Sequence, residues 1–260
     1  MRKRDVYGRS ADFYDALYEP LVDYDGDVDY LLKAFAKHGK GKPKRVLDVG
    51  AGTCNHALRL AKRGVGVDAV DISESLLAVA ARKVEASGLG ERVKLHRMDM
   101  TRDLPKGRFD GAISMFGAWC YARTDEEASR LLSVLHARLP KGGLFAFEFW
   151  SPLGWAPVQS WAEADLPDGR RLVRLTRPSM ELREDVYEFE TEHIVMRDGE
   201  LVENFSEGHG LRLRTPYQTQ ALLARNGFEV AAFTRGAREG KSFEKPAPNE
   251  FRVMCLARRT

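Results

Sequence analysis

The chain contains little cysteine: only Cys54, Cys120 and Cys255 occur in 260 residues, and none lies at a spacing that would bind zinc. Because three is an odd number, the paired disulfide framework of a small secreted domain is not expected. The sequence also lacks a signal peptide and any run of about 18 apolar residues, the length that a membrane-spanning helix requires. These absences predict a cytoplasmic protein with no metal site and no membrane partner.

A large excess of charge is absent as well. The 41 Lys and Arg residues nearly balance the 38 Asp and Glu residues, which gives a net charge of +3. Basic residues cluster only at the two tips of the chain, in residues 1–4 and 258–259. Since so small a net charge creates no long-range attraction for a polyanion, we expect no nucleic-acid partner. The sequence does not fix the oligomeric state and leaves a homodimer open.

What the chain does contain is a small-residue loop between an apolar run and a helix-like stretch. The run ends in Asp48-Val49-Gly50-Ala51-Gly52, and glycines at such a place let the backbone approach a ligand closely. A second apolar run, residues 65–70, ends at Asp71. This acid follows the glycines by about 20 residues, the spacing at which a nucleotide-binding βαβ unit places a carboxylate against ribose hydroxyls.

The details of the loop decide between nucleotide ligands. Asn55 stands where a dinucleotide fingerprint has its third glycine, and no phosphate-binding Gly-Lys-Ser/Thr follows. Asp48, two residues before the first glycine, would repel a pyrophosphate but could hold an ammonium or a hydroxyl group. A ligand with a ribose at one end and an amino acid at the other satisfies both acids. S-adenosylmethionine (SAM) is such a ligand.

Five motifs in order between residues 45 and 150 make the chain resemble the class I SAM-dependent methyltransferases. The first is Asp48, Gly50 and Gly52, with Cys54 at the third glycine position, and the second is Asp71. The others are Asp99, the strand residues 109–116, and the turn 139–145. The resemblance implies SAM as cofactor, S-adenosylhomocysteine as product, and cofactor contacts from Tyr14, Tyr24, Asp48, Gly50, Ala51, Gly52, Asp71, Ile72, Asp99, Met100, Met115 and Phe116.

Alternation of strand-like and helix-like segments predicts an α/β fold, a doubly wound Rossmann-like sheet of seven strands. We expect strands over 45–49, 66–70, 92–96, 109–115, 143–149, 228–234 and 250–257, and helices over 10–24, 27–37, 54–63, 73–87, 125–138 and 216–226. Three parts are predicted: an N-terminal helical lid (1–44), the SAM-binding domain (45–155 and 216–260), and an inserted antiparallel β cap (156–215) for the substrate.

Within the cap the sequence predicts strands over 171–176, 185–197 and 201–214, with a two-residue hairpin turn at Asp198-Gly199. A regular hairpin with this turn would pair Val195 with Val202 and His193 with Asn204. It would also place the rings of Tyr187 and Phe189 over Gly210 and Gly208.

The N-terminal Tyr14-Asp15-x-x-Tyr18 pattern, Tyr24, the strand end Ser114-Met115-Phe116 and the cap are similar to those of small-molecule N-methyltransferases, such as amino-sugar N,N-dimethyltransferases and glycine N-methyltransferase. In the amino-sugar enzymes a histidine that helps to deprotonate the amine follows the fourth motif, and this chain has Tyr121 there. We expect Tyr14, Tyr121 and His209 to serve catalysis, with the acceptor between the cap, Tyr14 and the loop 119–121.

These inferences predict an enzyme that moves a methyl group from SAM to N or O of a small molecule by in-line displacement, with Asp71 holding both ribose hydroxyls. Two alternatives stay open. A protein or RNA methyltransferase would need a larger basic face. A SAM-binding protein without transfer activity would keep the same motifs, because they indicate cofactor binding and not turnover.

Overall fold

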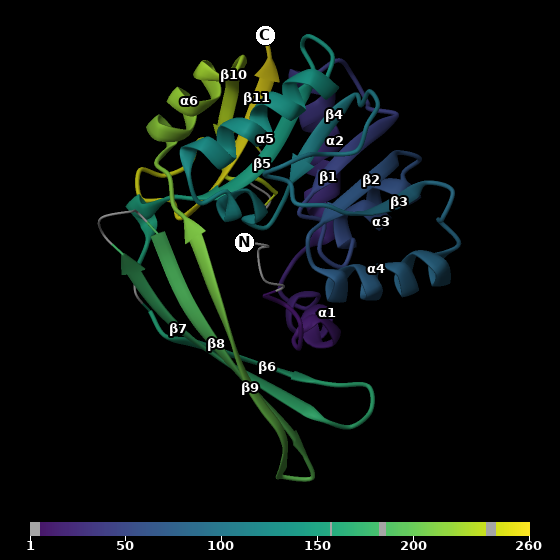
Figure 1. Ribbon diagram of the computed structural model, residues 1–260, viewed down its shortest axis with the longest axis vertical. Coiled ribbons are helices and arrows are strands. Elements are labelled where there is room, and N and C mark those ends of the chain that lie inside the picture. Colours follow the sequence, from purple (N-terminus) through teal and green to yellow (C-terminus); the bar gives the residue numbers. More distant parts are fainter. Residues whose placement is uncertain (1–5, 157, 182–185, 238–242) are drawn as a thin grey trace.

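The computed structural model describes residues 6–156, 158–181, 186–237 and 243–260, which form two sheets and the helices around them (Figure 1). The larger sheet has seven strands in the order β10-β11-β5-β4-β1-β2-β3, as the sequence predicts. All neighbours pair in parallel except β11, which runs antiparallel between β5 and β10. The strands are β1 (Arg45–Val49), β2 (Gly66–Asp71), β3 (Val93–Arg97), β4 (Gly111–Ser114), β5 (Leu144–Trp150), β10 (Phe228–Thr234) and β11 (Arg252–Arg259).

Helices cover both faces of this sheet because alternate side chains of the buried strands point to opposite sides. In β5, Leu144 and Ala146 join one apolar cluster, and Phe145 and Phe147 join the other. The first cluster includes α2 (Tyr24–His38), α3 (Asn55–Lys62) and α4 (Glu74–Ser87). The second includes α5 (Asp125–Arg138) and α6 (Pro216–Arg225). The doubly wound arrangement predicted from the sequence is therefore confirmed.

The helix starts follow local capping chemistry. The Ser73 hydroxyl accepts the N–H of Leu76, and the Thr124 hydroxyl accepts that of Glu127. Thr215 begins α6 with a complete capping box and a proline in the first turn. Side-chain acceptors of this kind satisfy N–H groups that the helix itself leaves unpaired, and each stabilises its helix by about 1 kcal/mol.

The N-terminal segment differs from the single helix predicted over 10–24. It forms a short 3₁₀ turn η1 (Ala11–Phe13), a helix α1 (Tyr14–Tyr18) and a connecting turn. The Asp23 carboxylate then accepts the N–H of Gly26, so that α2 begins at Tyr24 rather than at residue 27. Asp23 is a good N-cap residue, which explains why the chain starts a new helix here.

The cap is an antiparallel sheet in the order β6-β7-β8-β9, with the strands β6 (Ser160–Asp165), β7 (Arg171–Glu181), β8 (Val186–Arg197) and β9 (Glu200–Arg212). The sequence predicts the last three strands but misses β6. A β-bulge beside Val195 shifts the predicted hairpin register by one residue, so that Val195 faces Glu203 and His193 faces Phe205. Because such a shift exchanges the two faces of a strand, it turns Phe205 inward and leaves Val202 exposed. It also pairs Tyr187 and Phe189 with Leu211 and His209 instead of Gly210 and Gly208.

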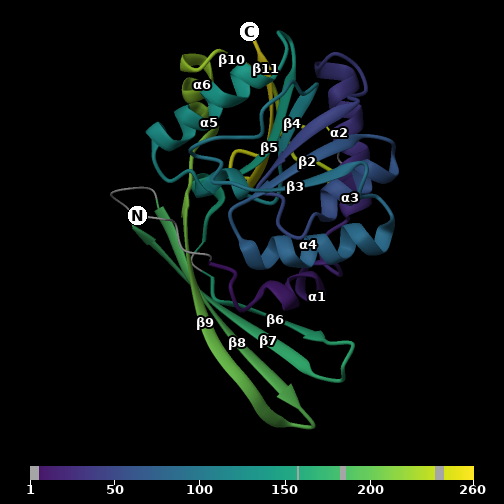
Figure 2. The ribbon, with the colours of Figure 1, turned by 45° about the vertical axis from the view of Figure 1, so that its right-hand side comes forward.

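The N-terminal segment bridges the two sheets. Phe13 and Leu17 pack against Leu172, Val195 and Phe205 of the cap in a third apolar cluster. In both ribbon views α1 lies between α4 and the cap strands, while the far ends of β8 and β9 extend away from the rest of the molecule (Figure 2). The segment thus forms one wall of the space between the large sheet and the cap.

Candidate cofactor and acceptor site

The glycine loop lies at the carboxyl end of β1, where ligands bind in open α/β sheets. The N–H groups of Gly50 and Ala51 donate to the carbonyl of Val70, which folds the loop across the end of β2. Gly50 has a φ of 77°, and a Cβ at that position would lie 2.4 Å from the Ala118 Cβ. Only glycine fits both this backbone conformation and this contact.

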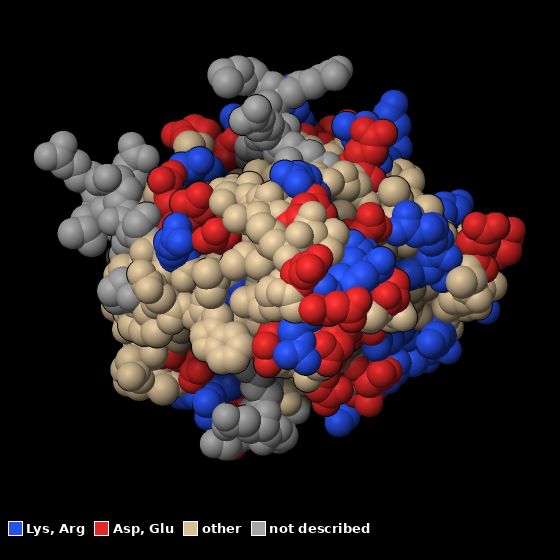
Figure 3. Space-filling view, turned by 90° about the horizontal axis from the view of Figure 1, so that it is seen from below, with Lys and Arg blue, Asp and Glu red and all other residues tan. Residues whose placement is uncertain are grey.

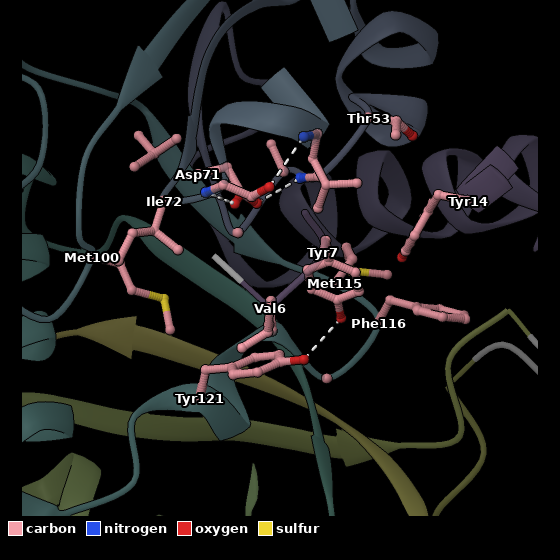
Figure 4. Close-up of a pocket in the computed structure, with 18 of the residues that line it drawn as sticks. Val6, Tyr7, Tyr14, Thr53, Asp71, Ile72, Met100, Met115, Phe116 and Tyr121 are labelled. Atoms are coloured by element: carbon pink, nitrogen blue, oxygen red, sulfur yellow. Dashed lines mark hydrogen bonds between the residues drawn. The ribbon is translucent and has the colours of Figure 1, made fainter. Parts of the chain in front are cut away.

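Asp71 connects the loop to the next helix. One of its carboxylate oxygens accepts the N–H of Gly52 at 2.8 Å, and the other accepts the N–H of Ser73 at 2.9 Å (Figure 4). Asp71 therefore shapes the loop in addition to the ribose role that the sequence predicts. These bonds fix the orientation of the carboxylate at the end of β2, beside the cavity.

Asp48 lies at the inner end of the site and is almost fully buried. Its Oδ2 atom is buried and has no hydrogen-bond partner in the part of the chain that the structure describes. Burial raises the pKa of this carboxyl group to about 7, although His56 opposes the rise. A buried carboxyl group with an unused oxygen is costly unless a ligand supplies a donor. An amino group on the ligand would meet that need.

A cavity of about 370 Å³ joins this loop to the N-terminal segment and the cap. All twelve residues predicted to contact the cofactor line it, and so does Tyr121. Residues outside that prediction also line it, among them Val6, Tyr7, Thr53, Asn55, Arg123, Trp150, Phe189, Gly208 and Gly210. Acids and glycines gather at the β1 end, and aromatic side chains and glycines gather toward β9. The two ends thus suit two different molecules.

Some predicted residues also have structural roles. Asp99 accepts the N–H and the hydroxyl of Thr101, which fixes the loop after β3. The ring of Tyr24 packs edge-on against His56. Phe116 has a φ of 58°, a strained value for a residue with a side chain, and its ring lies between Tyr18 and the Arg252 guanidinium. Strain of this kind is typical of functional sites.

The sequence analysis did not select Tyr7, which follows the basic N-terminal tip by three residues. Its hydroxyl is 2.8 Å from the Tyr121 hydroxyl, and its ring packs edge-on against Tyr14 (Figure 4). Burial raises the pKa of Tyr7, Tyr14 and Tyr121, so all three phenols stay protonated. No helical or strand periodicity covers residues 6–9, so no pattern distinguishes Tyr7 from its neighbours.

His209, which the sequence analysis expects to serve catalysis, lies one layer behind the cavity wall. Its Nδ1 atom is 2.9 Å from the Tyr121 hydroxyl, and its ring stacks on Phe189. The imidazole borders a second pocket of about 40 Å³ instead of the large cavity. Trp119 of the predicted acceptor loop is fully buried against Phe147 and belongs to the core.

Two further properties concern the described residues only. No group of three His, Cys, Asp or Glu side chains is arranged to hold a metal ion. No helix within the described ranges is long and apolar enough to cross a membrane.

Comparison with known proteins decides the family. A model of the methyltransferase domain matches residues 46–143, the segment that holds the glycine loop, Asp71 and Asp99. Residues 46–143 are therefore a methyltransferase domain of the class I SAM-dependent type. The predicted family and its cofactor, SAM, are thereby confirmed. The partnerless Asp48 oxygen, the Asp71 carboxylate and the adjoining cavity fit the amino group, the ribose and the body of SAM.

The relatives named here are methyltransferases. Two relatives, from Geobacillus sp. (strain WCH70) and Thermus thermophilus, are each 32% identical over 56% of this chain, and the chain spans only 58% and 66% of their lengths. The second is a demethylmenaquinone methyltransferase. The dTDP-3-amino-3,4,6-trideoxy-alpha-D-glucopyranose N,N-dimethyltransferase of Streptomyces venezuelae is 28% identical over 85% of this chain and 90% of that enzyme.

The fold likeness extends over the cap as well. The crystal structure of a SAM-dependent methyltransferase from Clostridium acetobutylicum ATCC 824 matches with a TM-score of 0.80 at 20% identity, over 97% of this chain and 98% of that one. At this identity the match establishes the fold alone.

Proposed function

We propose that the protein methylates the amine nitrogen of a small molecule, with an amino sugar as the favoured acceptor class. The observation that carries this proposal is the composition of the cavity. Its inner end has the buried acids expected for SAM, and its outer end is formed by Tyr121, Trp150, Phe189 and the cap strand β9. An aromatic wall with a few hydroxyl groups suits an acceptor of small or medium size.

The groups beside the cavity favour nitrogen over oxygen. Bound SAM supplies an electrophilic methyl group that an acceptor lone pair attacks in line. Tyr7, Tyr14 and Tyr121 are protonated phenols that can orient an amine, and aromatic faces attract its cationic form. A neutral amine needs orientation more than a strong base, and correct orientation lowers the barrier by several kcal/mol. The amino-sugar N,N-dimethyltransferases, similar over 85% and 91% of this chain, support the same assignment.

The RNA or protein alternative gains no support from the surface in Figure 3. On that face, acidic and basic side chains are interspersed instead of forming a field of one sign. With a net charge of only +3, we propose that no nucleic acid is bound.

A cytoplasmic location and a homodimer are also part of the proposal. The three buried, unpaired cysteines are compatible with a reducing compartment.

Methyl transfer from labelled SAM tests the function. We would compare amino sugars, free and nucleotide-linked, with matched sugars that carry a hydroxyl in place of the amine. Transfer to the amine, with much slower transfer to the hydroxyl analogue, is the expected result. Equal transfer to both would remove the assignment to nitrogen. Labelling confined to RNA or protein would favour a macromolecular acceptor, and SAM binding without any transfer would favour a non-catalytic protein.

A further inference from the structure

Two tyrosine hydroxyl groups and one imidazole, from distant parts of the chain, form one continuous line of hydrogen bonds. The Tyr7 hydroxyl lies 2.8 Å from the Tyr121 hydroxyl, which lies 2.9 Å from His209 Nδ1. Tyr7 comes from the N-terminal segment, Tyr121 from the turn η2 (Ala118–Tyr121) after β4, and His209 from β9. The line starts at the cavity wall and ends behind it.

The ends of the line differ in chemistry. Tyr7 and Tyr121 line the cavity where the acceptor is placed, whereas His209 borders only the smaller pocket. Burial, with smaller effects of His193 and Arg174, lowers the pKa of His209 to about 4, so its imidazole is neutral and its Nδ1 lone pair can take the Tyr121 proton but passes it on instead of retaining it. Phenols can pass a proton by accepting one and donating another, because each oxygen is both donor and acceptor. The line therefore runs from two neutral relays to one base.

We propose that Tyr7, Tyr121 and His209 form a proton relay that removes one proton from the acceptor's ammonium group before methyl transfer. This proposal rests on the proposed N-methylation. The ammonium N–H bond breaks and its proton forms a bond to the Tyr7 oxygen. The Tyr7 proton moves to Tyr121, and the Tyr121 proton moves to His209 Nδ1. The nitrogen keeps the electron pair and becomes nucleophilic, and the imidazole becomes a cation.

A charge on the cofactor side and a pocket behind His209 both help the proton to leave the acceptor. When SAM is bound, its sulfonium charge would disfavour a second positive charge on the acceptor and would so lower the pKa of the ammonium. Behind His209, the smaller pocket has room for a water molecule. One oxygen of Glu207 accepts the backbone N–H groups of Arg9 and Ser10. Its other oxygen is buried without a partner among the described residues and can receive the proton.

The charged and titratable groups around that pocket come from every element packed on it. Tyr7, Tyr14 and Tyr18 belong to the N-terminal segment, Arg174 to β7, His193 to β8, and Glu207 and His209 to β9. Arg174 donates to the Tyr18 hydroxyl and keeps positive charge near His209. This charge promotes loss of the Nε2 proton from the imidazolium to the pocket. The Nδ1–H tautomer that remains returns to its starting form by proton exchange, and the two hydroxyl groups turn back, before the next turnover.

A pair of substitutions separates proton transfer from simple positioning. Tyr121→Phe interrupts the line. His209→Asn keeps a polar atom near Nδ1 that can hold the Tyr121 hydroxyl, but it cannot accept a proton at neutral pH. If the relay operates, both variants should lose about a hundredfold in kcat near neutral pH, the scale of general acid–base catalysis. Tyr217→Phe and His136→Asn, on α6 and α5, are matched controls that should keep the full rate.

The pH profile gives the sharper readout. Without the relay only the free amine reacts, so the variants' rate should rise about tenfold per pH unit below the pKa of the acceptor's ammonium. The wild-type rate should level off at a lower pH than the variants' rate, because the relay lets the bound ammonium lose its proton within the site. An acceptor whose ammonium group has a low pKa, such as an O-alkylhydroxylamine analogue, needs no deprotonation and should restore the variants to within a few fold of wild type. SAM affinity, measured by calorimetry, should stay unchanged.

Several results would overturn the relay. Full activity of His209→Asn would show that His209 only orients Tyr121, and failure of the low-pKa acceptor to restore rates would indicate misplaced substrate. An imidazole ¹⁵N NMR shift of His209 that is the same in wild type and Tyr121→Phe would disprove the hydrogen-bond line without reference to turnover. If wild type methylates no amine at all while that shift does change, the line exists but the proposed function fails, and the relay role fails with it.

Discussion

The Asp15 carboxylate in α1 lies 2.6 Å from the Lys83 ammonium in α4, and the contact joins the N-terminal segment to the cofactor-binding half of the protein. The other Asp15 oxygen accepts the Thr53 hydroxyl at 2.6 Å and the Asn55 amide at 2.8 Å. Thr53 and Asn55 both line the cavity immediately after the glycine loop. Asp15 thus holds the wall that contains Tyr7 and Tyr14 against the loop that the family uses for SAM.

This contact leads to a prediction about Asp15→Asn. The variant should increase hydrogen exchange over residues 10–24 and weaken SAM binding by one to a few kcal/mol, because charged hydrogen bonds in a partly buried place are lost. S-adenosylhomocysteine should slow exchange in the wild-type segment by a larger factor than in the variant. Arg82→Ala is a matched control. It breaks the neighbouring but exposed Arg82–Asp12 pair, which should contribute little. Equal exchange in Asp15→Asn and wild type would contradict the role of this contact.

Asp48 predicts an unusual dependence of stability on pH. Its pKa in the folded protein is raised to about 7 by burial, above the ordinary value of 3.8. The folded state therefore holds the proton more tightly than the unfolded state. The contribution of the Asp48 carboxyl group to the free energy of unfolding is fully present below about pH 4 and is lost as the pH rises toward 7. In chemical denaturation without ligand, Asp48→Asn should gain stability relative to wild type over this range. A constant difference between pH 4 and pH 7 would show that Asp48 does not titrate there.

The same group should couple SAM binding to proton release. If the ligand's ammonium pairs with Asp48, binding favours the charged carboxylate and expels a proton near pH 6. Calorimetry in buffers of different ionisation enthalpy should detect this release in wild type, and SAM affinity should fall as the pH drops below about 7. Asp48→Asn should bind more weakly and show neither effect. Identical proton release in the variant would assign the linkage to another group.

Two glycines of the loop should respond differently to alanine. Gly50→Ala places a methyl group 2.4 Å from the Ala118 Cβ at a φ of 77°, so it combines a steric clash with backbone strain. Gly52→Ala meets nothing within 4 Å and carries only the strain of a φ of 54°, about 1–2 kcal/mol. Thermal unfolding should therefore show a larger loss of stability for Gly50→Ala. Similar losses for both would mean that the contact with Ala118 relaxes freely.

The residues that the sequence predicts for the cofactor come together in the fold because the constraints on them are local. Gly50, Gly52 and Asp71 lie at strand ends whose position follows from parallel pairing, and all the predicted cofactor residues line one cavity. The acceptor half depends on contacts between residues far apart in the chain. Tyr7 and Tyr121 are 114 positions apart, and Tyr121 and His209 are 88 apart. No periodicity encodes such pairs.

The cap shows a second limit. The Asp198-Gly199 turn was correctly predicted, and both residues have positive φ values, of 52° and 83°. The turn alone does not fix the register, because the bulge beside Val195 adds one residue to β9. Packing decides the register instead, since Val195 and Phe205 then enter the cluster around Phe13 and Leu17. Strand β6 was missed because most of its side chains are exposed, including Trp161 at 66%, so it lacks a clear apolar face.

The last prediction concerns the wall that should select the acceptor. Gly208 lines the cavity from β9, and a Cβ built on it meets nothing within 4 Å, so larger side chains would project into open space. If the acceptor lies against this strand, Gly208→Ala should raise its KM modestly and Gly208→Leu by about tenfold or more, as added bulk excludes the substrate. SAM affinity should remain unchanged, because the cofactor residues lie at the opposite end. Gly90→Ala, in an open loop position before β3, is the matched control. Weaker SAM binding with an unchanged acceptor KM in Gly208→Leu would show that the two ends of the cavity have been assigned in the wrong order.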